Sequence, residues 1–169
     1  MKNKKFIVIT AILAFLAICC VIFIFSNSLK DSAESTDQTM VVKDILARIA
    51  KFFGIKGDID TSGLRSFAHV AEFGLLGACI AAISLCAAYK KGKFTLGELL
   101  PFIIFALVGG VLIAIADEIL QLSSEGRACE LKDVGLDAVG VVIGTFFSCA
   151  VAFVGGKIHN ARKLKENDK

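Results

Sequence analysis

The sequence predicts an all-α integral membrane protein: a bundle of four transmembrane helices with one extracytoplasmic amphipathic helix. Three observations support this fold class. Hydrophobic residues make up 56% of the 169 residues, a larger share than in ordinary globular proteins, and the mean hydropathy is +0.73. Four apolar runs each have roughly the 20 residues that a helix needs to cross the hydrocarbon core. The chain contains one proline, and the runs lack the polar–apolar alternation of barrel strands.

The predicted spans form a single membrane domain that covers 1–169. They lie at 6–25, 67–88, 100–120 and 134–156. The first span follows Lys2, Lys4 and Lys5, as a signal peptide would. Its apolar core is too long for a signal peptide, and no small-residue cleavage site follows Phe25. We therefore expect an uncleaved membrane anchor.

The segment between the first two spans is predicted to contain an amphipathic helix at 36–53. Apolar residues recur there at helical spacing, with charged residues between them. Ser35 and Gln38 fit a capping box, and Gly54 is a natural end. We expect this helix to lie on the outer membrane surface or over the bundle.

Basic residues predict the orientation. They gather at 2–5, 90–93 and 157–165, three places that an even number of spans puts on one side of the membrane. Because Lys and Arg are enriched in cytoplasmic loops, both termini should be cytoplasmic, with 26–66 and 121–133 outside.

Charge and cysteine content exclude several function classes. The net charge of +3 is small, and the basic residues lie at span ends rather than on one face, so no nucleic-acid partner is expected. The six cysteines include no CxxC pair, which supports neither a zinc site nor a disulfide framework. No cofactor is predicted, and the oligomeric state is left open.

Charged residues inside the spans are the most informative feature, because each costs about 2.5–3.5 kcal/mol at the bilayer centre. His69 and Glu72 begin the second span, Asp117 and Glu118 end the third, and Asp137 begins the fourth. At 1.5 Å per residue, all lie within roughly 10 Å of the outer interface. Three helices therefore deliver polar groups to one layer.

Spacing places these groups on common helix faces. His69 and Glu72 are three residues apart, and Asp117 and Gln121 are four apart. The fourth span carries a stripe that ends in a GxxxG packing pattern: Asp133, Asp137, Gly140 and Gly144. Arg65 and Arg127 flank the region as counter-ions. The candidate binding residues are Arg65, His69, Glu72, Asp117, Glu118, Gln121, Arg127, Asp133 and Asp137, with Gly140 and Gly144 for helix packing.

Three interpretations of this cluster compete. The first is a structural network of hydrogen bonds and ion pairs that fixes helix register. The second is a pocket, open to the outside, that recognises an anionic or polar group. The third is catalysis or metal binding. The chain has no HExxH or other specific ligand spacing, so a metal is not expected, and an enzyme is less favoured than a binding protein.

In order along the chain, these residues resemble the motifs of the VanZ-like family. They are Ser26-Asn27-Ser28; Arg65 and His69; Asp117-Glu118 and Gln121; Gly126-Arg127; and Asp133, Asp137, Gly140 and Gly144. The resemblance covers 6–156. Ser124-Glu125 stands where family members usually carry Phe or Pro before the Gly-Arg pair.

The resemblance implies a protein of the bacterial cytoplasmic membrane that reduces susceptibility to teicoplanin-type glycopeptide antibiotics. The partners that it suggests are membrane lipid, a lipid-linked cell-wall precursor or a glycopeptide. Two alternatives remain: a hydrolase or transferase acting on a lipid-linked substrate, and a structural protein that works through a partner.

Overall fold

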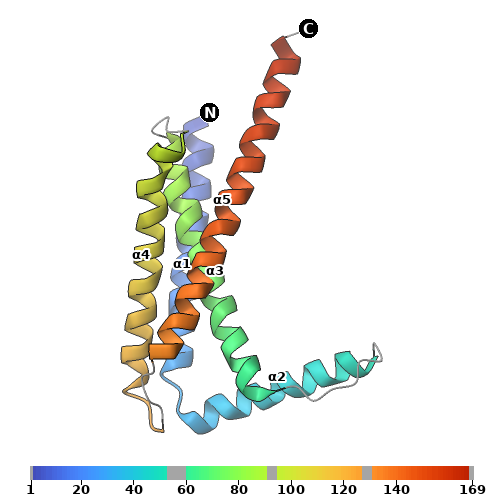
Figure 1. The fold of residues 1–169 in the computed structure, drawn as a ribbon, viewed down its shortest axis with the longest axis vertical. Helices are drawn as coiled ribbons and strands as arrows, with labels where there is room; N and C mark the ends of the chain where they lie inside the picture. The colour runs from blue at the N-terminus through green and yellow to red at the C-terminus, as the bar shows by residue number, and fades with distance from the viewer. Residues whose placement is uncertain (1, 53–59, 91–94, 127–130, 168–169) are drawn as a thin grey trace.

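A computed structural model describes residues 2–52, 60–90, 95–126 and 131–167. The described residues form five helices and no strand. The helices are α1 (Lys2–Ser28), α2 (Ser32–Phe52), α3 (Thr61–Lys90), α4 (Leu96–Gln121) and α5 (Leu131–Asn167). Figure 1 shows α1, α3, α4 and α5 side by side, with α2 across one end of the bundle. The predicted all-α class is confirmed.

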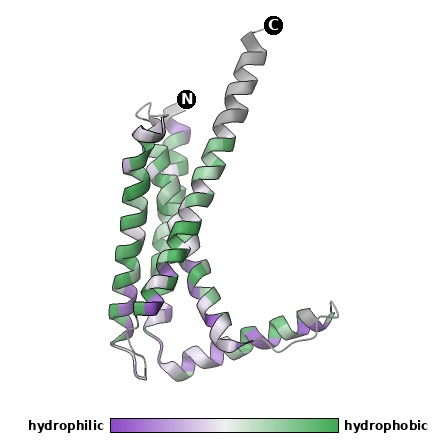
Figure 2. Cartoon of the chain, in the orientation of Figure 1, coloured by the Kyte–Doolittle hydropathy of each residue, from purple (hydrophilic) through white to green (hydrophobic). Residues whose placement is uncertain are grey.

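Among the described residues, four helices are long and apolar enough to cross a membrane. The spans lie within α1, α3, α4 and α5, and each of these helices extends beyond its predicted apolar run. Most of their large apolar side chains face outward, where lipid accommodates them at no cost. In Figure 2, the ribbon along the middle of the bundle is mostly green, the colour of hydrophobic residues, and purple hydrophilic residues are more frequent toward α2.

The amphipathic helix begins earlier than predicted. Asp31 precedes α2, and its Oδ1 accepts a hydrogen bond from the Glu34 amide at 2.8 Å, so α2 starts at Ser32 rather than at residue 36. Ser35, the predicted cap, lies inside the first turns of α2. Asp31, rather than Ser35, caps α2, because it follows the end of α1 almost directly. It accepts the first hydrogen bonds that the backbone amides of α2 donate. The predicted end, Phe53 and Gly54, lies outside the described residues.

Side-chain caps begin the next two helices. Asp60 accepts hydrogen bonds from the Ser62 and Gly63 amides at 3.2 and 2.9 Å. Together with the Ser62 hydroxyl, these bonds lower the pKa of the Asp60 carboxyl. Thr95 and Glu98 form a reciprocal capping box at the start of α4.

The most extensive contact between two helices is that of α3 with α5, and it depends on glycines from both helices. A methyl group added at Gly140 would lie 2.5 Å from the Val70 carbonyl oxygen, and one at Gly77 would lie 2.6 Å from the Val141 carbonyl oxygen. A methyl group at Gly144 would overlap the Gly74 carbonyl. Only glycine allows the two backbones to approach this closely. Adjacent to this contact, Phe73, Leu76 and Val141 are fully buried.

Candidate functional site

Buried polar residues gather at the end of the bundle near α2. The side chains that are no more than 2% exposed there are Ser28, Asp117, Glu118, Gln121 and Asp137. They come from α1, α4 and α5, and His69 on α3 completes the group at intermediate exposure. Such a concentration of buried polar groups requires internal hydrogen bonds or counter-charge.

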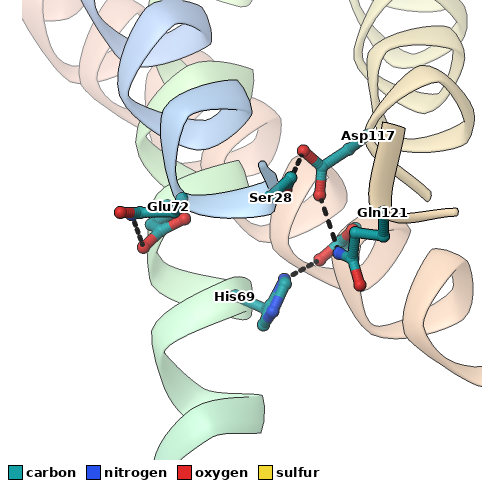
Figure 3. Close-up of polar contacts among 7 residues, drawn as sticks. Ser28, His69, Glu72, Asp117 and Gln121 are labelled. Carbon is teal, nitrogen blue, oxygen red and sulfur yellow. Dashed lines mark hydrogen bonds and ion pairs between the residues drawn. The ribbon is translucent and has the colours of Figure 1, made fainter. Parts of the chain in front are cut away.

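Asp117 on α4 is held by two hydrogen bonds. The Ser28 hydroxyl donates to its Oδ1 at 2.5 Å, and the Gln121 side-chain amide donates to its Oδ2 at 3.3 Å. Figure 3 shows Ser28 and Gln121 reaching Asp117 from α1 and from the following turn of α4. The carboxylate is therefore fixed in place where these two helices meet.

His69 and Asp137 meet across the glycine contact between α3 and α5. His69 Nδ1 lies 3.3 Å from Asp137 Oδ1. Gly140, one turn after Asp137, packs against the Val70 carbonyl, which directly follows His69 in the chain. The close approach of the two backbones thus brings the imidazole to the carboxylate. One ligand atom each from His69, Asp117 and Asp137 lies within 4.8 Å of the others.

A cavity of about 740 Å³ opens between α1, α2 and α3 beside this polar group. Lys30 Nζ donates to Asn27 Oδ1 at 2.9 Å, and Asn27 Nδ2 donates to Glu72 Oε1 at 3.4 Å. These three residues line the cavity together with Arg65 and His69. The wall therefore contains two cations, one carboxylate and an amide between them.

The segment after α4 is tied to the junction between α1 and α2. The Ser124 hydroxyl donates to the Ser28 carbonyl at 2.8 Å, and the Ser32 amide donates to the Glu125 carbonyl at 3.2 Å. Gly126 has a φ of 73° and packs against Ser32. A left-handed residue in such close contact favours glycine, which gives the glycine of the Gly126-Arg127 motif a physical role.

Comparison with known proteins identifies the family. The family model described as VanZ/LLP1 matches residues 12–152, a range that includes the polar group, the cavity and the glycine contact. The chain belongs to the VanZ/LLP1 family. No curated protein and no solved structure matches it. Family membership and the four apolar helices make it a multi-pass membrane protein.

In this VanZ/LLP1 chain, the predicted site residues fall into distinct places. His69, Asp117 and Asp137 converge, and Gln121 is bonded to Asp117. Glu118 is buried beside Asp117 in the sequence of α4, and Glu72 and Arg65 line the cavity. Asp133 is partly exposed in the first turn of α5, and Arg127 lies outside the described residues.

Sequence reasoning left Lys30 out of the candidate site, and it named Ser28 in the family motif but not among the candidate binding residues. Lys30 lies two residues after the end of α1 and three residues beyond Asn27, so its closeness in sequence to the polar end of α1 was the available signal. Ser28 is bonded to a residue 89 positions away, a relation that local spacing does not reveal.

Proposed function

We propose that this protein binds the anionic head group of a membrane lipid, or of a lipid-linked cell-wall precursor, in the cavity between α1, α2 and α3. One observation carries the proposal: the same cavity combines the cations Lys30 and Arg65 with an extensive apolar wall. A phosphate bound to a lipid tail requires both features. The cavity volume of about 740 Å³ lies within the range of roughly 300–1,000 Å³ that is common for ligand sites.

The apolar wall supports a lipid rather than a free anion. Phe23 of α1 and Val41, Val42 and Leu46 of α2 line it, together with Leu64 and Phe67 of α3. The α2 residues belong to a helix whose apolar side chains are largely exposed, as expected for a helix at a membrane interface. A tail can leave the cavity along α1 and α3 into the bilayer, while its head group contacts the cations.

The orientation follows from the basic flanks of the sequence. With both termini cytoplasmic, α2 and the cavity lie at the outer surface of the bacterial cytoplasmic membrane. Figure 1 places the beginning of α1 and the end of α5 toward the same end of the bundle, opposite α2. Lipid-linked cell-wall intermediates are exposed at that surface, so sequestering or shielding them alters how teicoplanin-type glycopeptides act.

Lipid binding tests the proposal directly. The purified chain is placed in nanodiscs, and its retention of phosphatidylglycerol, of a polyprenyl-linked diphosphate and of phosphatidylcholine is compared by native mass spectrometry. Arg65→Gln should lower retention of the two anionic lipids several-fold and leave phosphatidylcholine unchanged. Arg48→Gln is the matched control, because Arg48 is exposed on α2 and is not among the cavity-lining residues. Equal retention in both variants would refute binding through Arg65.

Antibiotic susceptibility tests the consequence. In a strain that the wild-type protein protects from teicoplanin, Arg65→Gln should restore susceptibility, whereas Arg48→Gln should not. Immunoblots of membrane fractions establish that both variants are inserted at the same level. If Arg65→Gln protected the strain fully, the antibiotic effect would not depend on the cavity. If the wild-type protein gave no protection, the proposed role in resistance would be refuted.

A further inference from the structure

Three side chains of metal-binding type converge from three different helices. His69 comes from α3, Asp117 from α4 and Asp137 from α5, and one ligand atom of each lies within 4.8 Å of the other two. Figure 3 shows His69 and Asp117 directed toward the same space between their helices. No ligand spacing along the chain reveals this group, because its members are brought together only by helix packing.

Asp137 indicates that the group is built for a ligand. Its side chain is fully buried, and neither carboxylate oxygen accepts a hydrogen bond from any residue in the described part of the chain. His69 is its described ion-pair partner. A buried carboxylate without hydrogen-bond donors is strongly unfavourable unless a cation compensates it. His69 supplies that charge only when it is protonated, whereas a bound metal ion would supply it beside a neutral imidazole. Here it faces a second buried carboxylate, that of Asp117, which increases the requirement for positive charge.

The separations suit a small divalent ion. Two ligands of a tetrahedral ion with bonds of about 2.0–2.1 Å lie about 3.3–3.4 Å apart. His69 Nδ1 and Asp137 Oδ1 are already 3.3 Å apart. The Asp117 carboxylate lies within 4.8 Å of both, so a side-chain shift of at most about 1.5 Å would complete a three-ligand set of this size.

Surrounding residues supply the support that metal ligands usually have. Ligating carboxylates are commonly oriented by hydrogen bonds from neighbouring side chains. The Ser28 hydroxyl and the Gln121 amide bind one oxygen each of Asp117, and each oxygen keeps a second lone pair for a cation. His69 and Ser28 also line the cavity between α1, α2 and α3, which provides a route for entry.

We propose that His69, Asp117 and Asp137 bind a divalent transition-metal ion, with Zn²⁺ as the preferred type and the remaining coordination position directed to the cavity. An imidazole favours Zn²⁺ over the hard ions Mg²⁺ and Ca²⁺, which take oxygen ligands. Three protein ligands with one open position are the arrangement of zinc sites that bind a further group. This site is independent of Arg65 and Lys30, so it stands whether or not the cavity binds a lipid.

The test is Zn²⁺ binding by the full chain in nanodiscs of zwitterionic lipid, which contain no anionic head group. After treatment with a chelator, the protein is titrated with Zn²⁺ against a fluorescent competitor. Wild type should bind one equivalent, and Asp137→Asn should lower the affinity at least about tenfold. Asp44→Asn should bind like wild type, because Asp44 is exposed on α2 and is not among the residues that line the cavity.

Two further measurements make the result decisive. His69→Gln is titrated in parallel, and helical circular dichroism with gel filtration selects the variants that are folded. The absorption spectrum of the Co²⁺ form identifies the ligands, because cysteine ligation adds an intense thiolate band. One equivalent without that band, lost in a folded Asp137 or His69 variant, supports the site. No stoichiometric binding, a thiolate band, or equal affinity in Asp44→Asn and Asp137→Asn would overturn it.

Discussion

Replacing Gly144 with alanine is expected to separate α3 from α5. The added methyl group would lie 2.7 Å from the Ala78 amide nitrogen and closer still to the Gly74 carbonyl, whereas ordinary contacts begin at 3.4 Å. The obstructing atoms belong to the backbone of α3, so no side-chain rotation relieves the overlap. The helices must move apart by more than half an ångström.

The magnitude follows from two opposing effects. Overpacking typically lowers the free energy of unfolding by about 1–3 kcal/mol. Because the neighbouring atoms at Gly144 belong to a rigid backbone, we expect a cost of about 3 kcal/mol there. Alanine recovers about 1 kcal/mol of helix propensity relative to glycine. We therefore expect Gly144→Ala to lower the free energy of unfolding by about 2 kcal/mol.

Reversible unfolding with SDS in mixed micelles measures this change. Gly135→Ala is the matched control on the same helix, because a methyl group there meets nothing within 4 Å. It should be neutral or slightly stabilising. If Gly144→Ala unfolds at the same SDS fraction as Gly135→Ala, the α3–α5 contact does not depend on glycine and the reasoning is refuted.

Two other substitutions test the neighbourhood of the site. Gly126→Ala should destabilise the protein by about 1 kcal/mol or more, because Gly126 has a positive φ and contacts Ser32; a lower melting temperature in detergent is the expected reading, and an unchanged one would contradict it. Ser28→Ala should cost about 1–3 kcal/mol by removing a buried donor to Asp117. In that case SDS unfolding is the measurement, Ser26→Ala at an exposed position of α1 is the control, and equal stability of the two variants would argue against the bond.

The spans could be predicted because their signal is compositional. A run of about 20 apolar residues has few alternatives to a membrane helix, and local sequence suffices to detect it. The start of α2 was predicted wrongly for a related reason: Asp31 and Ser35 are both acceptable caps in sequence. Their choice depends on how tightly the chain turns after α1. That turn is fixed by contacts with Ser124 and Glu125, which lie far along the chain.

The gathering of the candidate site residues at one end of the bundle could also be predicted, since their level follows from counting residues along each helix. The identity of its contacts could not. Asp137, for example, was expected to have the flanking arginines as counter-ions, and its described ionic partner is His69. The cavity depends on the direction in which α2 leaves α1, and local periodicity contains no information about that direction.

The geometry of the polar group depends on helix register more than on any residue within it. A slip of one residue along α5 would turn its side chains by about 100°, moving Asp137 away from His69 and exposing a carboxylate to lipid. The glycine contact prevents this slip, because the positions next to Gly140 carry β-branched or larger side chains, Val139 and Val141, that cannot take its place against the Val70 carbonyl. The packing stripe and the polar residues therefore act as one unit. The glycines fix the register, and the register decides which buried groups meet. A stable bundle with a displaced register would retain every polar residue and still lose the site, which is why binding and stability need separate measurements in this protein.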